Sequence, residues 1–169
     1  MTYSLQTSPN IQELVLFLEL AFSKLAEKDS VEFDTVDHQS LLEWFDILSM
    51  EYYMLQDNAI LIEARDDGKL VGAICIGKQS PIFWPDGRKI ELIILAVHPD
   101  FRQKGIGKKL IMQAEIEAKG MGGKSVVVNT HHALTQVQNL YKKLGYSEIG
   151  TLKDYYDNGD AVFLMKKLN

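Results

Sequence analysis

The chain has 169 residues, of which 46% are hydrophobic and 24% are charged, and its formal net charge at pH 7 is -5. This composition is ordinary for a globular protein, and the length is close to that of one domain with a sizeable core. The acidic balance does not indicate a surface for nucleic acid or for an anionic membrane.

Cysteine usage and hydropathy exclude further classes of protein. The single cysteine, Cys75, cannot form an internal disulfide, and no Cys/His cluster has zinc spacing, so we expect no metal site. No apolar run is long enough to span a membrane, and the opening segment MTYSLQTSPN lacks the basic and apolar regions of a secretion signal. We therefore expect a soluble cytoplasmic protein.

The N-terminal part of the chain predicts one strand and two helices. A short strand over 3–7 is closed by the turn residues 8–10. The helix that follows has apolar residues at i, i+3, i+4 and i+7 spacing: Ile11, Leu14, Val15, Leu18 and Phe22. After a polar stretch over 28–38, which reads as a loop, we expect a second helix over 40–50. Neither helix carries a recognisable chemical motif.

From residue 58 onward the chain predicts a sheet with two more helices. Strands are expected over 58–65, 69–78, 89–97, 124–130, 146–152 and 161–168. The first two are joined by the hairpin signal Asp66-Asp67-Gly68. Helices are expected over 106–119 and over 134–144, the second ending at Gly145. The order βααβββαβαββ predicts an α/β or α+β mixed sheet flanked by helices, and without a linker or repeat we expect a single domain over 1–169.

The segment HPDFRQKGIGKKL, residues 98–110, lies where an expected strand passes into a helix. Backbone N–H groups at a helix start have no intrahelical partner and, with the helix dipole, attract an anion such as a phosphate. Gly105 and Gly107 would let the backbone approach such a ligand closely. The cations around the turn are Arg102, Lys104, Lys108 and Lys109. The segment is neither a Walker A loop nor GxGxxG, in which Leu110 would have to be glycine, so a flexible glycine turn without a ligand is the alternative.

A second motif, NLYKKLGYSEIG at 139–150, supplies the context that the turn lacks by itself. Together the two motifs resemble the GNAT superfamily of N-acetyltransferases, whose signatures are [RQ]xxGxG/A and LYxKLGF. Arg102, Gly105 and Gly107 match the first signature, and residues 140–146 match the second. The closing AVFLMKKL also resembles the last strand of the family. The resemblance implies the GNAT fold, with a central, mostly antiparallel, twisted sheet of about seven strands flanked by helices.

The ligand implied by the resemblance is coenzyme A. Backbone groups of residues 103–108 would hold its pyrophosphate, and the strand at 95–97 would pair with the pantetheine arm as if it were an added strand. The residues implied for the co-substrate acetyl-CoA are Leu95, Ala96, Val97, Arg102, Gln103, Lys104, Gly105, Ile106, Gly107 and Lys108.

Acetyl transfer to an amine is helped by a proton donor for the leaving thiolate and by a base for the amine. Tyr141 takes the position of the family's tyrosine and would be the proton donor, unless its ring only packs against the sheet. Glu91 is our candidate base, because it is the only acid in the apolar run KIELIILAV and partial burial would raise its pKa. That run also resembles the strand that carries the glutamate base in histone-acetylating members of the family.

The assignment of Glu91 as the base is open to an alternative. Glu91 could be a strand-start residue that faces water or pairs with Lys89 or Arg88. His131 and His132, just past the expected strand 124–130, could then accept the proton instead.

The sequence departs from the family pattern at Leu134, where an asparagine often binds the cofactor; Asn129 and Asn139 are near but fall on other positions. We interpret Cys75 as a core residue, since it lies in an apolar strand without a partner histidine in view.

The function that the resemblance implies is an acetyl-CoA-dependent N-acetyltransferase that acts by direct attack of a primary amine in a ternary complex. The alternative is a catalytically degenerate acyl-CoA-binding regulatory or interaction module. The expected partner is a small-molecule or peptide amine, not nucleic acid or membrane, and a homodimer is left open. Phe83 and Trp84 could line an acceptor pocket or simply close a hairpin. Tyr155 and Tyr156 fall in KDYYDNGDA, which resembles a strand-connecting loop that contacts a peptide N-terminus in several branches.

Overall fold

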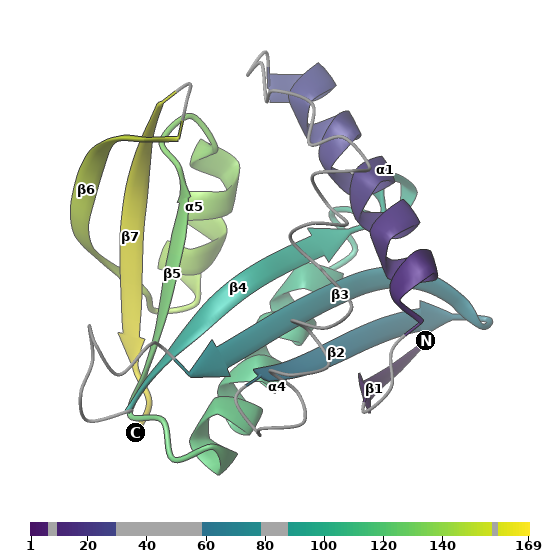
Figure 1. Ribbon diagram of the computed structural model, residues 1–169, viewed down its shortest axis with the longest axis horizontal. Helices are drawn as coiled ribbons and strands as arrows, with labels where there is room; N and C mark the ends of the chain where they lie inside the picture. The colour runs from purple at the N-terminus through teal and green to yellow at the C-terminus, as the bar shows by residue number, and fades with distance from the viewer. Residues whose placement is uncertain (7–9, 30–58, 79–87, 157–158) are drawn as a thin grey trace.

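The computed structural model describes residues 1–6, 10–29, 59–78, 88–156 and 159–169 (Figure 1). Seven strands form one sheet in the order β1-β2-β3-β4-β5-β7-β6. They are β1 (Thr2–Gln6), β2 (Ala59–Asp66), β3 (Lys69–Lys78), β4 (Lys89–Val97), β5 (Ser125–His131), β6 (Ser147–Tyr156) and β7 (Gly159–Lys167). The described helices are α1 (Ile11–Asp29), α4 (Ile106–Gly120), α5 (Thr135–Lys143) and a 3-10 turn over Pro99–Phe101. The predicted mixed α/β fold is confirmed.

The predicted spans agree closely with the observed elements. β3 and β4 match residue for residue, and the other described elements agree within one or two residues except β6. β6 continues to Tyr156, so Tyr155 and Tyr156 lie at the end of a strand and not in the expected loop. The residues that extend this strand are polar and mostly exposed, so no apolar alternation marked them as strand. The helix expected over 40–50 and the candidate acceptor residues Phe83 and Trp84 lie outside the described residues.

The sheet is antiparallel at every pairing except that between β4 and β5, which is parallel. The β2–β3 hairpin turns through Asp67 and Gly68, whose φ angles are 48° and 79°. Two successive positive φ values are the requirement of a type I′ turn, so the predicted hairpin signal is confirmed.

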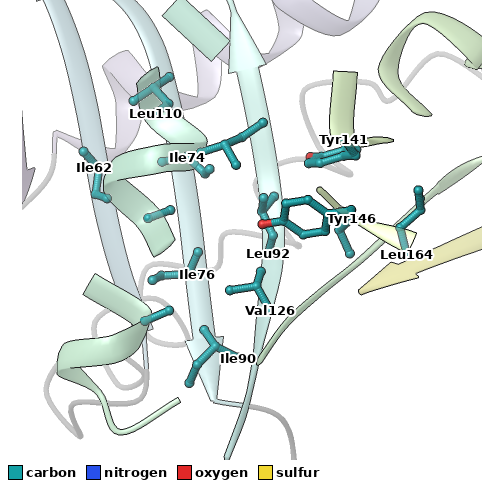
Figure 2. Close-up of a cluster of buried hydrophobic side chains, with 14 of the residues drawn as sticks. Ile62, Ile74, Ile76, Ile90, Leu92, Leu110, Val126, Tyr141, Tyr146 and Leu164 are labelled. Carbon is teal, nitrogen blue, oxygen red and sulfur yellow. The ribbon is translucent and has the colours of Figure 1, made fainter. Parts of the chain in front are cut away.

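Helix α1 covers one face of the sheet, and α4 and α5 cover the other (Figure 1). The first core cluster, on the α1 side, joins Leu14 and Leu18 of the helix to Ile94 and Ala96 of β4. The second core cluster joins Leu110 of α4 and Tyr141 of α5 to sheet residues on the opposite face (Figure 2). The apolar positions predicted for α1 therefore form its buried face.

β4 and β5 separate after their first few residues. Cys75 pairs with Ile94 and Ile76 pairs with Leu92, so Ile93 is an extra residue that makes a bulge in β4. The parallel pairing between β4 and β5 ends at Leu92 and Val128, and beyond it the two strands diverge (Figure 1). The sheet therefore opens into a split between the second half of β4 and the second half of β5.

Candidate active site at the split in the sheet

The second half of β4 has one open edge. Residues 94–97 pair with β3 on one side, and within the described residues no strand pairs with them on the other. His98 donates its N–H to the Val71 carbonyl of β3 at 2.9 Å. Because backbone groups alternate in direction along a strand, those of Val97 and Leu95 point to the open edge. The predicted cofactor residues Leu95 and Val97 thus direct backbone groups toward the split, although the Val97 carbonyl also accepts from Arg102 Nε at 3.3 Å. The backbone groups of Ala96 point toward β3.

The glycine turn lies at the end of this edge. Gly105 has a φ of 81° and stands at the N-terminus of α4, where no side chain of the described residues caps the helix. Gln103 also has a positive φ, of 61°. The first N–H groups of α4, from Ile106 onward, therefore lack intrahelical partners and point out of the turn. An uncapped helix start of this kind is suited to an anion.

The two motif glycines differ in what surrounds them. A Cβ added at Gly105 would have no atom within 4 Å, so this glycine is required by its backbone conformation. A Cβ at Gly107 would lie 3.6 Å from Val97 Cγ2 and 3.8 Å from Leu140 Cδ2, which are ordinary contacts. The protein itself would therefore accept a side chain at Gly107, so packing within the described residues does not require a glycine there.

The cations of the turn do not all surround the open space. Lys104 lies over the Phe101 ring, with its Nζ 4.7 Å from the ring centroid. Arg102 donates from Nη2 to the Ala21 carbonyl at 2.6 Å and from Nε to the Val97 carbonyl at 3.3 Å. Lys108 and Lys109 are exposed on the first turn of α4. The open backbone edge and the uncapped helix start together fit the pantetheine and pyrophosphate of coenzyme A expected from the sequence.

Tyr141 lies in α5, on the α4 side of the sheet, and is 2% exposed. Burial raises the pKa of its hydroxyl well above the ordinary value, so the group is held in its protonated form. Its ring meets that of Tyr146 edge to face. A buried, protonated phenol beside the split can donate a proton.

Glu91 lies on the other face of the sheet. Its neighbours Ile90 and Leu92 are buried in the cluster that contains Tyr141, and side chains alternate along a strand. Glu91 therefore points to the α1 face, and it is half-buried in the part of β4 that pairs with β5. The structure thus places the predicted acid and base on opposite faces of the sheet, next to the split.

His131 and His132 are restricted by hydrogen bonds at Nδ1. The Nδ1 of His131 accepts from the Ala133 N–H at 3.2 Å, and the Nδ1 of His132 accepts from the Asp160 N–H at 3.1 Å. In a neutral imidazole the other nitrogen, Nε2, then carries the proton. In that tautomer, neither ring has a lone pair at Nε2 to accept a proton from an amine.

The tip of β6 adds a contact that the sequence did not predict. The Tyr156 hydroxyl donates to Asn129 Oδ1 of β5 at 2.7 Å, and burial raises the pKa of Tyr156 to about 12. Asn129 lies two positions from the paired residue Val127, on the same face as Glu91. No local pattern links these two residues, which are 27 positions apart.

Other sequence-based interpretations concern residues away from the split. Leu134 is buried at the start of α5, and its side chain makes no cap hydrogen bond there. Cys75 is buried on the α1 face, and burial raises its pKa to about 12, so it is held as a thiol. Across the described part of the chain, no group of three or more His, Cys, Asp or Glu could hold a metal ion, and no helix is long and apolar enough to cross a membrane.

Comparisons with known proteins point to one family. Residues 20–146 match the Acetyltransferase (GNAT) family. The chain is 30% identical over 132 residues to N-alpha-acetyltransferase 30 of Dictyostelium discoideum, which covers 78% of this chain and 70% of that protein. It is 26% identical over 144 residues to mycothiol acetyltransferase of Propionibacterium freudenreichii subsp. shermanii, covering 84% of this chain but only 41% of that longer relative.

The fold is also that of solved acetyltransferase structures. PaiA N-acetyltransferase from Thermoplasma acidophilum, solved in complex with coenzyme A, superposes with a TM-score of 0.73 over 99% of both chains. The sequence identity of the pair is 18%, so this likeness concerns the fold.

Proposed function

Because the chain belongs to the GNAT acetyltransferase family, we propose that it is an N-acetyltransferase that moves the acetyl group of acetyl-CoA to a primary amine. The observation that carries the proposal is the split between β4 and β5. An open backbone edge and an uncapped helix start line it, and Tyr141 and Glu91 lie on its opposite faces. In the proposal, an extended thioester lies along this split, between a proton donor and a base.

Binding of the co-substrate is assigned to backbone groups. The backbone of Leu95 and the N–H of Val97 would pair with the amides of the pantetheine arm, as an added strand pairs with a sheet. The N–H groups at the start of α4 would bind the pyrophosphate, assisted by the helix dipole and by Lys108. Gly107 keeps the surface of this turn low enough for the ligand to reach the backbone.

Acetyl-CoA supplies an activated thioester when it is bound. Glu91 accepts the proton that the amine loses as its nitrogen bonds to the acetyl carbon, directly or through water. Tyr141 donates its proton to the sulfur as the carbon–sulfur bond breaks. An amine that approaches from the α1 face would meet Glu91, and Tyr141 would protonate the sulfur from the other face, so the two residues would act from opposite faces of the sheet. Both reactants are present together, and no covalent enzyme intermediate is needed.

The acceptor is a primary amine whose class is open between small molecules and peptides. The similarity to N-alpha-acetyltransferase 30 makes a peptide α-amino group the first acceptor to test. A single domain over 1–169, a cytoplasmic location and a homodimer stay predictions.

The test is release of free thiol from acetyl-CoA in the presence of an amine panel: short peptides with free N-termini, lysine peptides, polyamines and aminoglycosides. We expect amine-dependent thiol release and an acetylated amine detectable by mass spectrometry. Tight acetyl-CoA binding without turnover on any amine would support the acyl-CoA-binding module instead.

A further inference from the structure

The side chain of Arg102 leaves the glycine turn and reaches helix α1. Its Nη2 donates to the Ala21 carbonyl of α1 at 2.6 Å, and its Nε donates to the Val97 carbonyl at the end of β4 at 3.3 Å. Arg102 itself begins the segment that leads into the N-terminus of α4. One guanidinium thus connects the helix on the Glu91 face, the open strand edge and the anion-binding turn.

Helix α1 has a second attachment that does not involve the turn. Arg65 of β2 donates from Nη1 and Nη2 to the two carboxylate oxygens of Glu13, at 3.0 and 2.7 Å. Glu13 lies near the N-terminus of α1, and Ala21 lies eight residues later, about 12 Å along the helix axis. The Arg65–Glu13 pair joins α1 to strand β2, and the Arg102–Ala21 hydrogen bond joins it to the residues expected to bind phosphate.

The position of α1 bears on the acceptor face. Leu14 and Leu18 of the helix pack on Ile94 and Ala96, which belong to the half of β4 that forms the open edge. Glu91 points to the same face of the same strand. A shift of α1 would therefore change the surface over which an amine approaches the split.

We propose that Arg102 is a positioning residue that couples coenzyme A binding at the turn to the placement of α1, and so to acceptor binding. This inference rests on the proposed function. A phosphate on the N–H groups of the turn restricts the backbone from Arg102 to Lys108, and the guanidinium transmits that restriction to the Ala21 carbonyl. Coupling between two binding sites is reciprocal, so an acceptor that stabilises α1 also strengthens coenzyme A binding.

A simpler role for Arg102 would be to supply positive charge beside the pyrophosphate. The variant Arg102→Lys separates the two roles. Lysine keeps the charge but lacks the planar fork that lets one side chain donate to two carbonyls in fixed directions. If the role of Arg102 is positive charge, Arg102→Lys should largely keep wild-type activity. If its role is the connection to α1, Arg102→Lys should lose the coupling between coenzyme A binding and α1.

The experiment measures amide hydrogen exchange of residues 11–29 with and without saturating coenzyme A, together with calorimetric affinity. In the wild type we expect coenzyme A to slow exchange in α1 by about fivefold or more, the lower end of ordinary coupling. In Arg102→Lys we expect coenzyme A still to bind but to leave α1 exchange unchanged. The KM for the acceptor should rise by a similar factor, with a smaller change in coenzyme A affinity.

The matched control is Glu13→Gln, which removes the carboxylate that pairs α1 with Arg65 and leaves Arg65 bonded to the buried Glu63. Exchange in α1 should be faster without ligand, yet coenzyme A should still slow it, because the Arg102 connection is intact. If the wild type binds coenzyme A but exchange of the α1 amides is not slowed, the coupling is overturned and the proposed function still stands. The coupling is also overturned if coenzyme A slows α1 amide exchange in Arg102→Lys as much as in the wild type. A wild type that fails to bind coenzyme A would overturn the proposed function itself, and the coupling with it.

Discussion

The rings of Tyr141 and Tyr146 meet edge to face, with centroids 5.2 Å apart and an interplanar angle of 61° (Figure 2). Both tyrosines are buried, and burial raises the pKa of each hydroxyl above its ordinary value. Edge-to-face packing of this kind depends on the rings and not on the hydroxyl of Tyr141. Removal of that hydroxyl should therefore leave the position of the ring unchanged.

The variant Tyr141→Phe tests the proton donor. We expect wild-type folding and coenzyme A affinity, with kcat lower by roughly 10²-fold to 10⁴-fold, the usual contribution of general acid catalysis. Steady-state kinetics on the identified acceptor provide the measurement. The control is Tyr146→Phe, which removes the neighbouring buried hydroxyl and should keep kcat within about tenfold of the wild type. An unchanged kcat in Tyr141→Phe would leave Tyr141 with a packing role only.

The two motif glycines should respond differently to alanine. Gly105→Ala places a Cβ at a φ of 81°, which costs roughly 1–2 kcal/mol and should lower Tm by roughly 2–8 °C. Gly107→Ala meets only ordinary contacts and adds helix propensity, so Tm should be unchanged or slightly higher.

Coenzyme A affinity then distinguishes a ligand requirement from a structural one. For Gly107→Ala we expect the affinity to fall about tenfold or more, comparable to loss of one hydrogen bond to a charged group. Thermal melts give Tm, and calorimetry on the same preparations gives the coenzyme A affinity. Wild-type coenzyme A affinity in a folded Gly107→Ala protein would contradict the assignment of the pyrophosphate to this turn.

The sequence predicted local features well, because each depends on residues close together. The span of β4, the hairpin at Asp67-Gly68 and the C-terminal glycine of α5 follow from apolar runs and from positions that need positive φ. Gly145, with a φ of 91°, confirms the last of these.

Features that depend on distant residues could not be predicted in this way. The bulge at Ile93 is one, because residues 92–97 are apolar throughout and nothing in them distinguishes an extra residue from a paired one. The hydrogen bond from Arg102 to Ala21 joins residues 81 positions apart. The motif predicted an arginine beside an anion. That the guanidinium of Arg102 donates to α1 is seen only once the packing of this helix is known.

The Arg65–Glu13 ion pair should contribute to stability in a pH-dependent way. Hydrogen bonding from Arg65 holds the pKa of Glu13 below its ordinary value, so the contribution is present at neutral pH and is lost as pH falls through the lowered pKa. Glu13 is 38% exposed, so solvent screens the pair and a contribution at the modest end is expected. Glu13→Gln should therefore lower Tm by about 1–3 °C at pH 7 and have a smaller effect at acid pH. An equal effect at both pH values would show that the ionised pair does not stabilise the fold.

Glu91→Gln tests the base, and it is the prediction on which the mechanism depends most. A protonated carboxyl cannot accept a proton, so the kcat/KM of the wild type should fall as pH is lowered. In Glu91→Gln this low-pH limb of the profile should be flatter, and the rate near neutral pH should be lower. Because the acceptor amine also titrates, wild type and variant must be compared on one acceptor. His132→Gln is the control: its Nδ1 already accepts from the Asp160 N–H, so this variant should keep the wild-type limb. Identical profiles for wild type and Glu91→Gln, with a changed profile for His132→Gln, would move the base from β4 to the end of β5.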